Sequence, residues 1–166
     1  TDNFKKCKKV DEIIMATTVN PKDDVLEEFA LKNNIKYFRG SEDNVLDRFI
    51  KCAKKFKLDL VVRSCADSPF IEPEQIDMLV EKFLKDDLDY LSMKTRDGRP
   101  LVLCGWGLAV EVFSLEALKK ISTLTSEKSD IEHVTPYLYH NQDKFKVKYT
   151  NYPKMNDFDA DDLRMT

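Results

Sequence analysis

Glycine and long hydrophobic runs are both scarce in this sequence. It has 4 glycines in 166 residues, and no loop of the glycine-rich kind that cradles phosphates is visible. No apolar run approaches the roughly 18 to 20 residues that span a bilayer, and the opening residues, TDNFKKCKK, lack the apolar core of a signal peptide. We therefore expect no membrane partner and a cytoplasmic location.

An excess of basic charge is also missing. Lys and Arg total 27 against 30 for Asp and Glu, which gives a net charge of -3. Proteins that bind nucleic acid usually present a strongly basic surface, so nucleic acid is not an expected partner. The 4 cysteines show no Cys-x-x-Cys spacing and lie in or beside apolar patterns. This indicates reduced thiols rather than a zinc site or a disulfide framework.

The length fits one domain, and its segments alternate between strand and helix patterns. Apolar and alternating runs predict strands at 10–18, 35–38, 58–62, 88–93, 108–114 and 145–149, with a short strand signal at 163–166. Periodic apolar stripes predict helices from Pro21 to about Asn34, over 44–56 with Ser41 or Asp43 as the cap, from Pro73 onward, over 115–124 and over 130–141. The alternation predicts an α/β fold.

One segment interrupts this alternation. Asp97-Gly98 is a strong hairpin signal, and it predicts an antiparallel excursion that returns through 101–103. We expect an inserted β-hairpin arm over about 93–104, free to contact another subunit.

The most informative stretch is LDLVVRSCADSPFIEP, residues 58–73. It reads as a strand, a loop that contains Asp67, and a helix that begins at Pro73. In an open α/β sheet this loop lies at the carboxyl end of the strand, where ligands bind. Asp67, four residues after Arg63, could hold Mg²⁺ against a polyphosphate, or it could be an ordinary turn or cap residue.

Four other positions leave two interpretations open. Glu111, among apolar neighbours, faces either a polar site or a solvated strand face. Trp106, between two glycines, lines a pocket or anchors the hairpin by packing. His133 acts as acid, base or phosphate ligand, or is structural. Gly40-Ser41 allows a flat ligand to approach the backbone, or forms a common turn before a helix.

Four motifs occur together in a familiar order: FRGSEDNVLDRF, VVRSCADSPFIEPEQID, GLAVEVFSLEAL and EHVTPYLY. With them the chain closely resembles cytidylyltransferases of the spore-coat polysaccharide type, relatives of CMP-sialate and CMP-Kdo synthetases. The resemblance covers nearly all of residues 10–166. It implies a three-layer α/β/α nucleotide-diphospho-sugar transferase-like (Rossmann-like) fold with a mixed sheet.

The resemblance also implies an activity and a site. The family joins CTP to a sugar acid or related acceptor with Mg²⁺ and releases pyrophosphate. By this likeness Asp67 is the metal ligand and acts in catalysis with Arg63. The implied nucleotide-binding residues are Arg39, Gly40, Ser41, Asn44, Ala66 and Ser68. The implied acceptor-binding residues are Trp106, Glu111, Glu132 and His133.

The sequence departs from the family pattern at both ends. No Gln-Ala-Arg and Ser-x-Arg-Leu-Pro-Gly-Lys phosphate loop precedes Val10, and the chain stops before the Val-Asp-Thr whose Asp is the family's usual second metal ligand. We therefore expect residues 1–166 to form a single nucleotidyltransferase domain, incomplete at both ends. A non-catalytic nucleotide- or sugar-binding module of the same fold is the alternative. Related synthetases pair through an inserted hairpin, so a homodimer is expected.

Overall fold

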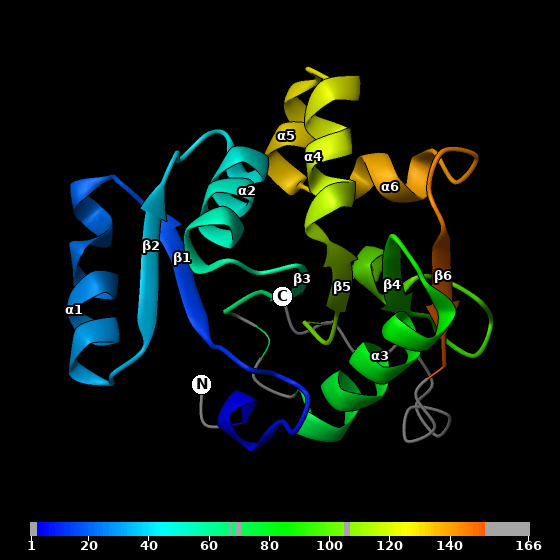
Figure 1. Ribbon diagram of the computed structural model, residues 1–166, viewed down its shortest axis with the longest axis horizontal. Coiled ribbons are helices and arrows are strands. Elements are labelled where there is room, and N and C mark those ends of the chain that lie inside the picture. The colour runs from blue at the N-terminus through cyan, green and yellow to red at the C-terminus, as the bar shows by residue number, and fades with distance from the viewer. Residues whose placement is uncertain (1–2, 67, 69–70, 105–106, 152–166) are drawn as a thin grey trace. The chain divides into compact units, whose positions relative to one another are not determined.

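The computed structural model describes residues 3–66, 68, 71–104 and 107–151 (Figure 1). By its internal contacts the chain divides into two compact units. Unit 1 comprises residues 1–10, 60–114 and 145–166, and unit 2 comprises residues 11–59 and 115–144. The expected single domain stays a prediction, because the units are described separately. Within the described residues, no helix is long and apolar enough to cross a bilayer.

Unit 2 is built on a pair of parallel strands, β1 (Ile14–Thr18) and β2 (Lys36–Gly40). A short 3-10 turn, η2 (Pro21–Asp23), leads into α1 (Asp24–Lys32), and both α1 and α2 (Val45–Phe56) contact the strand pair (Figure 1). The unit is completed by α4 (Leu115–Leu124), α5 (Lys128–His133) and α6 (Pro136–His140), of which α4 and α5 contact α2.

Local sequence explains where the first helices of unit 2 begin. The Asn20 side chain accepts a hydrogen bond from the backbone N–H of Lys22, and Pro21 occupies the first position of η2, as expected. For α2 the expected caps are wrong. Asn44 is the N-cap, and its side chain accepts from the N–H of Asp47, while the hydroxyl of Ser41 accepts from the N–H of Asn44.

Unit 1 contains a four-stranded mixed sheet in the order β3-β5-β4-β6. Its strands are β3 (Leu60–Ser64), β4 (Tyr90–Met93), β5 (Val110–Ser114) and β6 (Val147–Thr150). β5 is antiparallel to both β3 and β4, whereas β6 is parallel to β4. A 3-10 turn, η1 (Phe4–Lys6), also belongs to this unit. The mixed α/β class expected from the sequence is confirmed.

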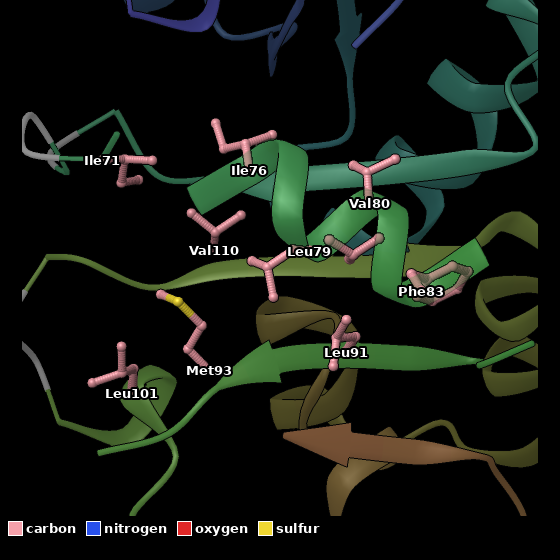
Figure 2. Packing of buried hydrophobic residues seen from close by; sticks show 10 residues of the cluster. Ile71, Ile76, Leu79, Val80, Phe83, Leu91, Met93, Leu101 and Val110 are labelled. Carbon is pink, nitrogen blue, oxygen red and sulfur yellow. The ribbon is translucent and has the colours of Figure 1, made fainter. Parts of the chain in front are cut away.

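One face of this sheet packs against α3 (Pro73–Asp86), which begins at Pro73 as predicted. Ile76, Leu79, Val80 and Phe83 of α3 meet Leu91, Met93, Val110 and Val112 of the strands, and Ile71 and Leu101 complete the cluster (Figure 2). Residues of a strand alternate between its two faces. Glu111 and Ser92 therefore point to the opposite face from this apolar cluster.

The predicted arm is correct at its turn and wrong at its returning strand. The N–H of Thr95 donates to the carbonyl of Arg99 and the N–H of Gly98 to that of Thr95, which closes the turn, and Gly98 adopts a φ of +93° that favours glycine. The only bridge around this turn in the described residues is Lys94 with Pro100. Residues Leu101–Leu103 form a 3-10 turn, η3, rather than a strand. Pro100 has no N–H to extend a ladder, and Leu101 turns into the apolar cluster.

The single helix expected over 130–141 is also wrong. The structure has two short helices, α5 and α6, separated by Val134, whose φ is +73°. The helical path is broken at Val134, and Pro136 then occupies the first turn of α6, where its missing N–H costs nothing.

The apolar cluster yields a stability prediction. Leu79 is 0% exposed on α3, so Leu79→Ala should lower the free energy of unfolding by about 2 to 5 kcal/mol through lost burial and a residual cavity. Leu84→Ala changes the same residue type on the same helix at a position 66% exposed, and should cost less than about 0.5 kcal/mol. Urea unfolding measures both variants. Equal losses would contradict the packing in Figure 2.

Candidate functional site

The predicted site residues fall into two sets, one in each unit. Unit 2 carries Arg39, Gly40, Ser41, Asn44, Glu132 and His133, and unit 1 carries Arg63, Ala66, Ser68 and Glu111. Asp67 and Trp106 lie outside the described residues.

In unit 2 the first set lies where β1 and β2 end side by side. The two parallel strands end in register at Thr18 and Gly40, and the N–H of Val19 donates to the carbonyl of Gly40 at 2.9 Å. The carboxyl end of parallel strands is the usual place for a ligand in an α/β fold. The segment from Gly40 to Asn44 therefore begins at a position suited to binding.

Arg39 lies in β2, which extends beyond the strand expected over 35–38. Its Nε donates to the carbonyl of Thr18 and one Nη to that of Asn20, each at 2.8 Å. The other Nη contacts two carboxylates of α1, Glu27 at 2.8 Å and Asp24 at 2.6 Å. This guanidinium thus fastens β2 to the end of β1 and to α1. Its role as a nucleotide ligand stays a prediction, and any such ligand would compete with four acceptors.

Glu27 of α1 contacts two residues of β2, Arg39 and Tyr37. Its carboxylate accepts hydrogen bonds from the hydroxyl of Tyr37 at 2.7 Å and from Arg39. These two donors lower the pKa of Glu27 below its ordinary value. No sequence pattern indicated this role, because Glu27 lies on the polar face expected for the helix.

Asp23 organises the turn that follows β1. One carboxylate oxygen accepts from the hydroxyls of Thr17 at 2.8 Å and Thr18 at 2.6 Å, and from the N–H of Thr18 at 3.1 Å. The hydroxyl of Thr18, then that of Thr17, then the Thr18 N–H lower the pKa of Asp23. The sequence analysis missed Asp23. The available signal was its place in the sequence, shortly after Thr17-Thr18 and Asn20-Pro21.

Gly40 is required by packing. A Cβ at this position would lie 2.8 Å from Cγ of Arg48 and 2.9 Å from Cε1 of Phe38, closer than ordinary contacts allow. Arg48 in turn donates to the carbonyl of Ser41 at 2.8 Å. The glycine therefore allows α2 to pack close to the end of β2. The predicted position of Gly40 near a ligand is compatible with this packing and stays a prediction.

Also in unit 2, Glu132 and His133 lie exposed on the last turn of α5. The next residue, Val134, is buried with φ +73° and ψ -52°, and the N–H of Thr135 donates to the carbonyl of His133 at 2.9 Å. This tight three-residue turn is unfavourable for a β-branched residue. Strain of this kind is concentrated at functional positions, so the turn favours a role for this segment.

In unit 1 the second set lies at the end of β3. Arg63 on β3 is paired in register with Glu111 on β5, and its Nη1 lies 2.9 Å from Oε2 of Glu111. The hydroxyl of Tyr90 donates to the other carboxylate oxygen at 2.8 Å. Glu111 is 4% exposed, so the solvated strand face left open by the sequence is excluded. Sequence analysis missed Tyr90, whose partner lies 21 residues away.

The loop that contains Asp67 begins directly after β3. Cys65 and Ala66 are exposed, whereas Ser68 is buried and its N–H donates to the carbonyl of Cys65 at 3.2 Å. Nowhere in the described part of the chain do three or more His, Cys, Asp or Glu side chains gather as a metal-binding group.

Comparison with solved structures defines the class of fold. The chain matches a cytidylyltransferase from Leptospira borgpetersenii serovar Hardjo-bovis with a TM-score of 0.85 and 27% identity, over 99% of this chain and 68% of that one. A CMP:2-keto-3-deoxy-manno-octonic acid synthetase complexed with CTP shares the fold, with a TM-score of 0.64 and 12% identity, over 91% of this chain and 77% of that one. The fold is that of the Rossmann-like nucleotidyltransferases.

Sequence comparison then gives the family. The cytidylyltransferase family model matches residues 1–162, and the chain belongs to that family, as its motifs predicted. It is 41% identical over 153 residues to the uncharacterized protein MJ1063 of Methanocaldococcus jannaschii, and 32% identical over 157 residues to the spore coat polysaccharide biosynthesis protein SpsF of Bacillus subtilis. These alignments cover 92% and 94% of this chain, but only 60% and 61% of the two relatives.

The contacts of Asp23 predict a dependence of stability on pH. Because the folded pKa lies below the ordinary value of 3.8, ionised Asp23 stabilises the folded state above about pH 3.8, and this contribution is lost as the pH falls through the folded pKa. Asp23→Asn should lower the melting temperature at pH 5 to 7, and the difference from wild type should shrink below about pH 3.8.

Thermal unfolding over this pH range measures the effect. Glu28→Gln, which removes an exposed carboxylate from α1, controls for the loss of one negative charge. A difference between wild type and Asp23→Asn that stayed constant down to pH 2 would show that ionised Asp23 does not hold the turn.

Proposed function

We propose that the protein is a CTP-dependent cytidylyltransferase that transfers CMP to a sugar acid or related acceptor. The observation that carries this proposal is the family match over residues 1–162. Two likenesses support it: SpsF is named for spore coat polysaccharide biosynthesis, and the Leptospira structure is a cytidylyltransferase. Cell-surface polysaccharide or glycan synthesis in the cytoplasm is the proposed setting.

The proposed reaction replaces a phosphoanhydride bond of CTP with a phosphoester bond to the acceptor. A hydroxyl oxygen of the acceptor attacks the α-phosphorus of CTP, and the bond from that phosphorus to the β-phosphate oxygen breaks. Pyrophosphate leaves with the bond electrons, and the hydroxyl proton passes to solvent or a base. Such transfers depend mainly on positioning and on charge neutralisation, so a fixed cation at the phosphates is the main requirement on the protein.

Arg63 is the residue we assign to this task. It lies on the strand that leads into the Asp67 loop, and its side chain is 18% exposed, so a ligand can reach it. In unit 2 the segment Gly40–Asn44 is assigned to the nucleoside, since it continues from the carboxyl end of two parallel strands. Ala66 and Ser68 are assigned to the nucleotide through the backbone of their loop.

Magnesium is proposed as the metal, held by Asp67. Mg²⁺ commonly binds through one or two carboxylates together with substrate phosphates, so a single protein carboxylate fits its chemistry. When bound, it would neutralise triphosphate charge and assist departure of pyrophosphate.

The acceptor-binding residues and the oligomeric state are proposed from fewer observations. Glu132 and His133 are exposed beside the strained turn at Val134, and we assign them to acceptor binding. Trp106 is assigned to acceptor binding from the family resemblance alone. A homodimer through the arm over 93–104 is proposed from the same resemblance.

The choice of nucleotide tests the proposal. Pyrophosphate release by the full-length protein, measured with CTP, ATP, GTP and UTP over a panel of sugar-acid acceptors, should favour CTP by at least about hundredfold in kcat/KM. Preference for another nucleotide would overturn the assignment. CTP binding without release of pyrophosphate would instead favour a non-catalytic nucleotide- or sugar-binding module.

Asp67→Asn tests the metal assignment. The substitution removes the charge that would hold Mg²⁺ but keeps the side-chain volume, so turnover should fall by about hundredfold or more while the melting temperature changes little. Glu81→Gln removes an exposed carboxylate from α3 of the same unit and should leave turnover unchanged. Ordinary turnover by Asp67→Asn would place the metal ligand elsewhere in the chain.

A further inference from the structure

A row of side chains crosses the four-stranded sheet of unit 1 at one level. Arg63 of β3 is in register with Glu111 of β5, Glu111 with Ser92 of β4, and Ser92 with Tyr149 of β6. Residues in register on neighbouring strands lie on the same face of a sheet. The opposite face carries the apolar cluster against α3 (Figure 2), so the sheet has one dry face and one face with this polar row.

The row lies toward the end of the sheet where ligands are expected. β3 and β4 both run antiparallel to β5, and β6 runs parallel to β4, so β3, β4 and β6 point the same way. The row passes through Arg63 near the end of β3, one residue before the strand finishes at Ser64. The carboxyl ends of these strands lead into the loops where α/β proteins bind ligands, and the Asp67 loop is one of them.

Glu111 is the buried centre of this row. A carboxylate with 4% exposure is costly unless both oxygens are satisfied. Here Oε2 accepts from Arg63 at 2.9 Å, and Oε1 accepts from the hydroxyl of Tyr90 at 2.8 Å. Ser92 is directed elsewhere, since its hydroxyl donates to the carbonyl of Val110 at 2.8 Å. The carboxylate is therefore held from two sides by Arg63 and Tyr90.

Tyr90 is well suited to be a fixed donor. It is 0% exposed, and its ring meets that of Tyr149 edge to face at a centroid distance of 6.0 Å. Burial, followed by the charge of Glu111, raises the pKa of the Tyr90 hydroxyl well above its ordinary value, so the proton stays on the tyrosine. The orientation of the Glu111 carboxylate is thus set by a group that does not itself titrate near neutrality.

Exposure increases from the centre of this network outward. The Glu111 side chain is 5% exposed and that of Arg63 is 18% exposed. The Arg63 side chain is therefore more accessible to a solute than the Glu111 side chain. The guanidinium of arginine is planar and presents its N–H donors in fixed directions, so the contact with Glu111 fixes the orientation of the whole group.

We propose that Glu111 is a positioning residue which, with Tyr90, holds the Arg63 guanidinium at the carboxyl end of β3 to meet the phosphates of the nucleotide. This inference rests on the proposed function and replaces the expected role of Glu111 in acceptor binding. Glu111 acts through Arg63 and does not touch the ligand. A buried ion pair with a purely structural role is the competing explanation, since such pairs also occur where no ligand binds.

A double-mutant cycle separates these explanations. Arg63→Gln, Glu111→Gln and the double variant are made in the full-length protein, and the Kd for CTP with Mg²⁺ is measured with kcat and KM for pyrophosphate release. Arg63→Gln should weaken CTP binding by about tenfold or more, the scale of one charge-assisted hydrogen bond. Glu111→Gln should weaken it to a smaller extent, and the double variant should be no worse than Arg63→Gln alone.

Two further variants guard the interpretation. Tyr90→Phe removes one hydroxyl and keeps the ring, so it should weaken CTP binding a few-fold in the wild-type background and not at all beside Arg63→Gln. Asp87→Asn breaks an exposed ion pair with Lys146 in the same unit, where the two side chains are 91% and 64% exposed. It should leave both the Kd and the kinetics unchanged.

Each other outcome overturns the inference. Multiplying effects of Arg63→Gln and Glu111→Gln would show that Glu111 contacts the ligand independently. Variants with wild-type Kd and kinetics but a lower melting temperature would show a structural pair only. If the wild-type protein binds no nucleoside triphosphate, the proposed function fails and this inference fails with it. If wild type binds and turns over CTP while the cycle is additive, the inference alone fails.

Discussion

A carboxylate without water must be met by donors, and this constraint on Glu111 shapes the four-stranded sheet. Glu111 lies on the central antiparallel strand, between β3 and β4, so its partners can come from either side. β3 supplies Arg63 and β4 supplies Tyr90. Shifting β5 by one residue would turn Glu111 toward the apolar cluster of α3, at a large desolvation cost. The pairing of Glu111 with Arg63 and Tyr90 and the burial of the apolar face therefore favour the same register of β5.

The strand pair of unit 2 meets a similar constraint with a different set of residues. Thr18 and Asn20 leave carbonyl groups at the end of β1, and Arg39 donates to both while it contacts the carboxylates of α1. Asp23 accepts from the two threonines of the same turn. A two-stranded parallel sheet has few ladder bonds, so side chains carry much of the connection between β1, β2 and α1. Charged residues at a strand end are thus not all available to a ligand.

This difference explains how far the sequence could predict the site. The helices were predictable because their signals are local: Asn20-Pro21 and Pro73 mark two starts, and periodic apolar residues mark the faces. Glu111 was recognisable as unusual within an apolar strand. Its partner Arg63 lies 48 residues away and Tyr90 lies 21 away, so no local pattern could identify them. The contacts of Arg39 were hidden for the same reason.

The wrong predictions have physical causes of the same kind. Asp97-Gly98 does form a turn, but Pro100 ends the pairing and burial of Leu101 favours η3 over a returning strand. Burial in the sheet core, which depends on the whole fold, decided a segment whose local residues also suited a hairpin. The family motifs were informative because each motif combines several local signals. They identify the family, but they do not separate the ligand-binding residues from those that hold the fold.

The Arg63–Glu111 ion pair orients the guanidinium but adds little net charge. A guanidinium beside a carboxylate contributes little net charge at a distance, so the pair would add little long-range attraction for a triphosphate. At contact distance the nearer guanidinium dominates, because Glu111 lies deeper and is shielded by Tyr90. The free-energy cost of ordering and desolvating the pair arises during folding, before any ligand binds. A dipole fixed in this way needs no reorganisation when phosphate charge moves during the reaction, which is the property that electrostatic catalysis requires.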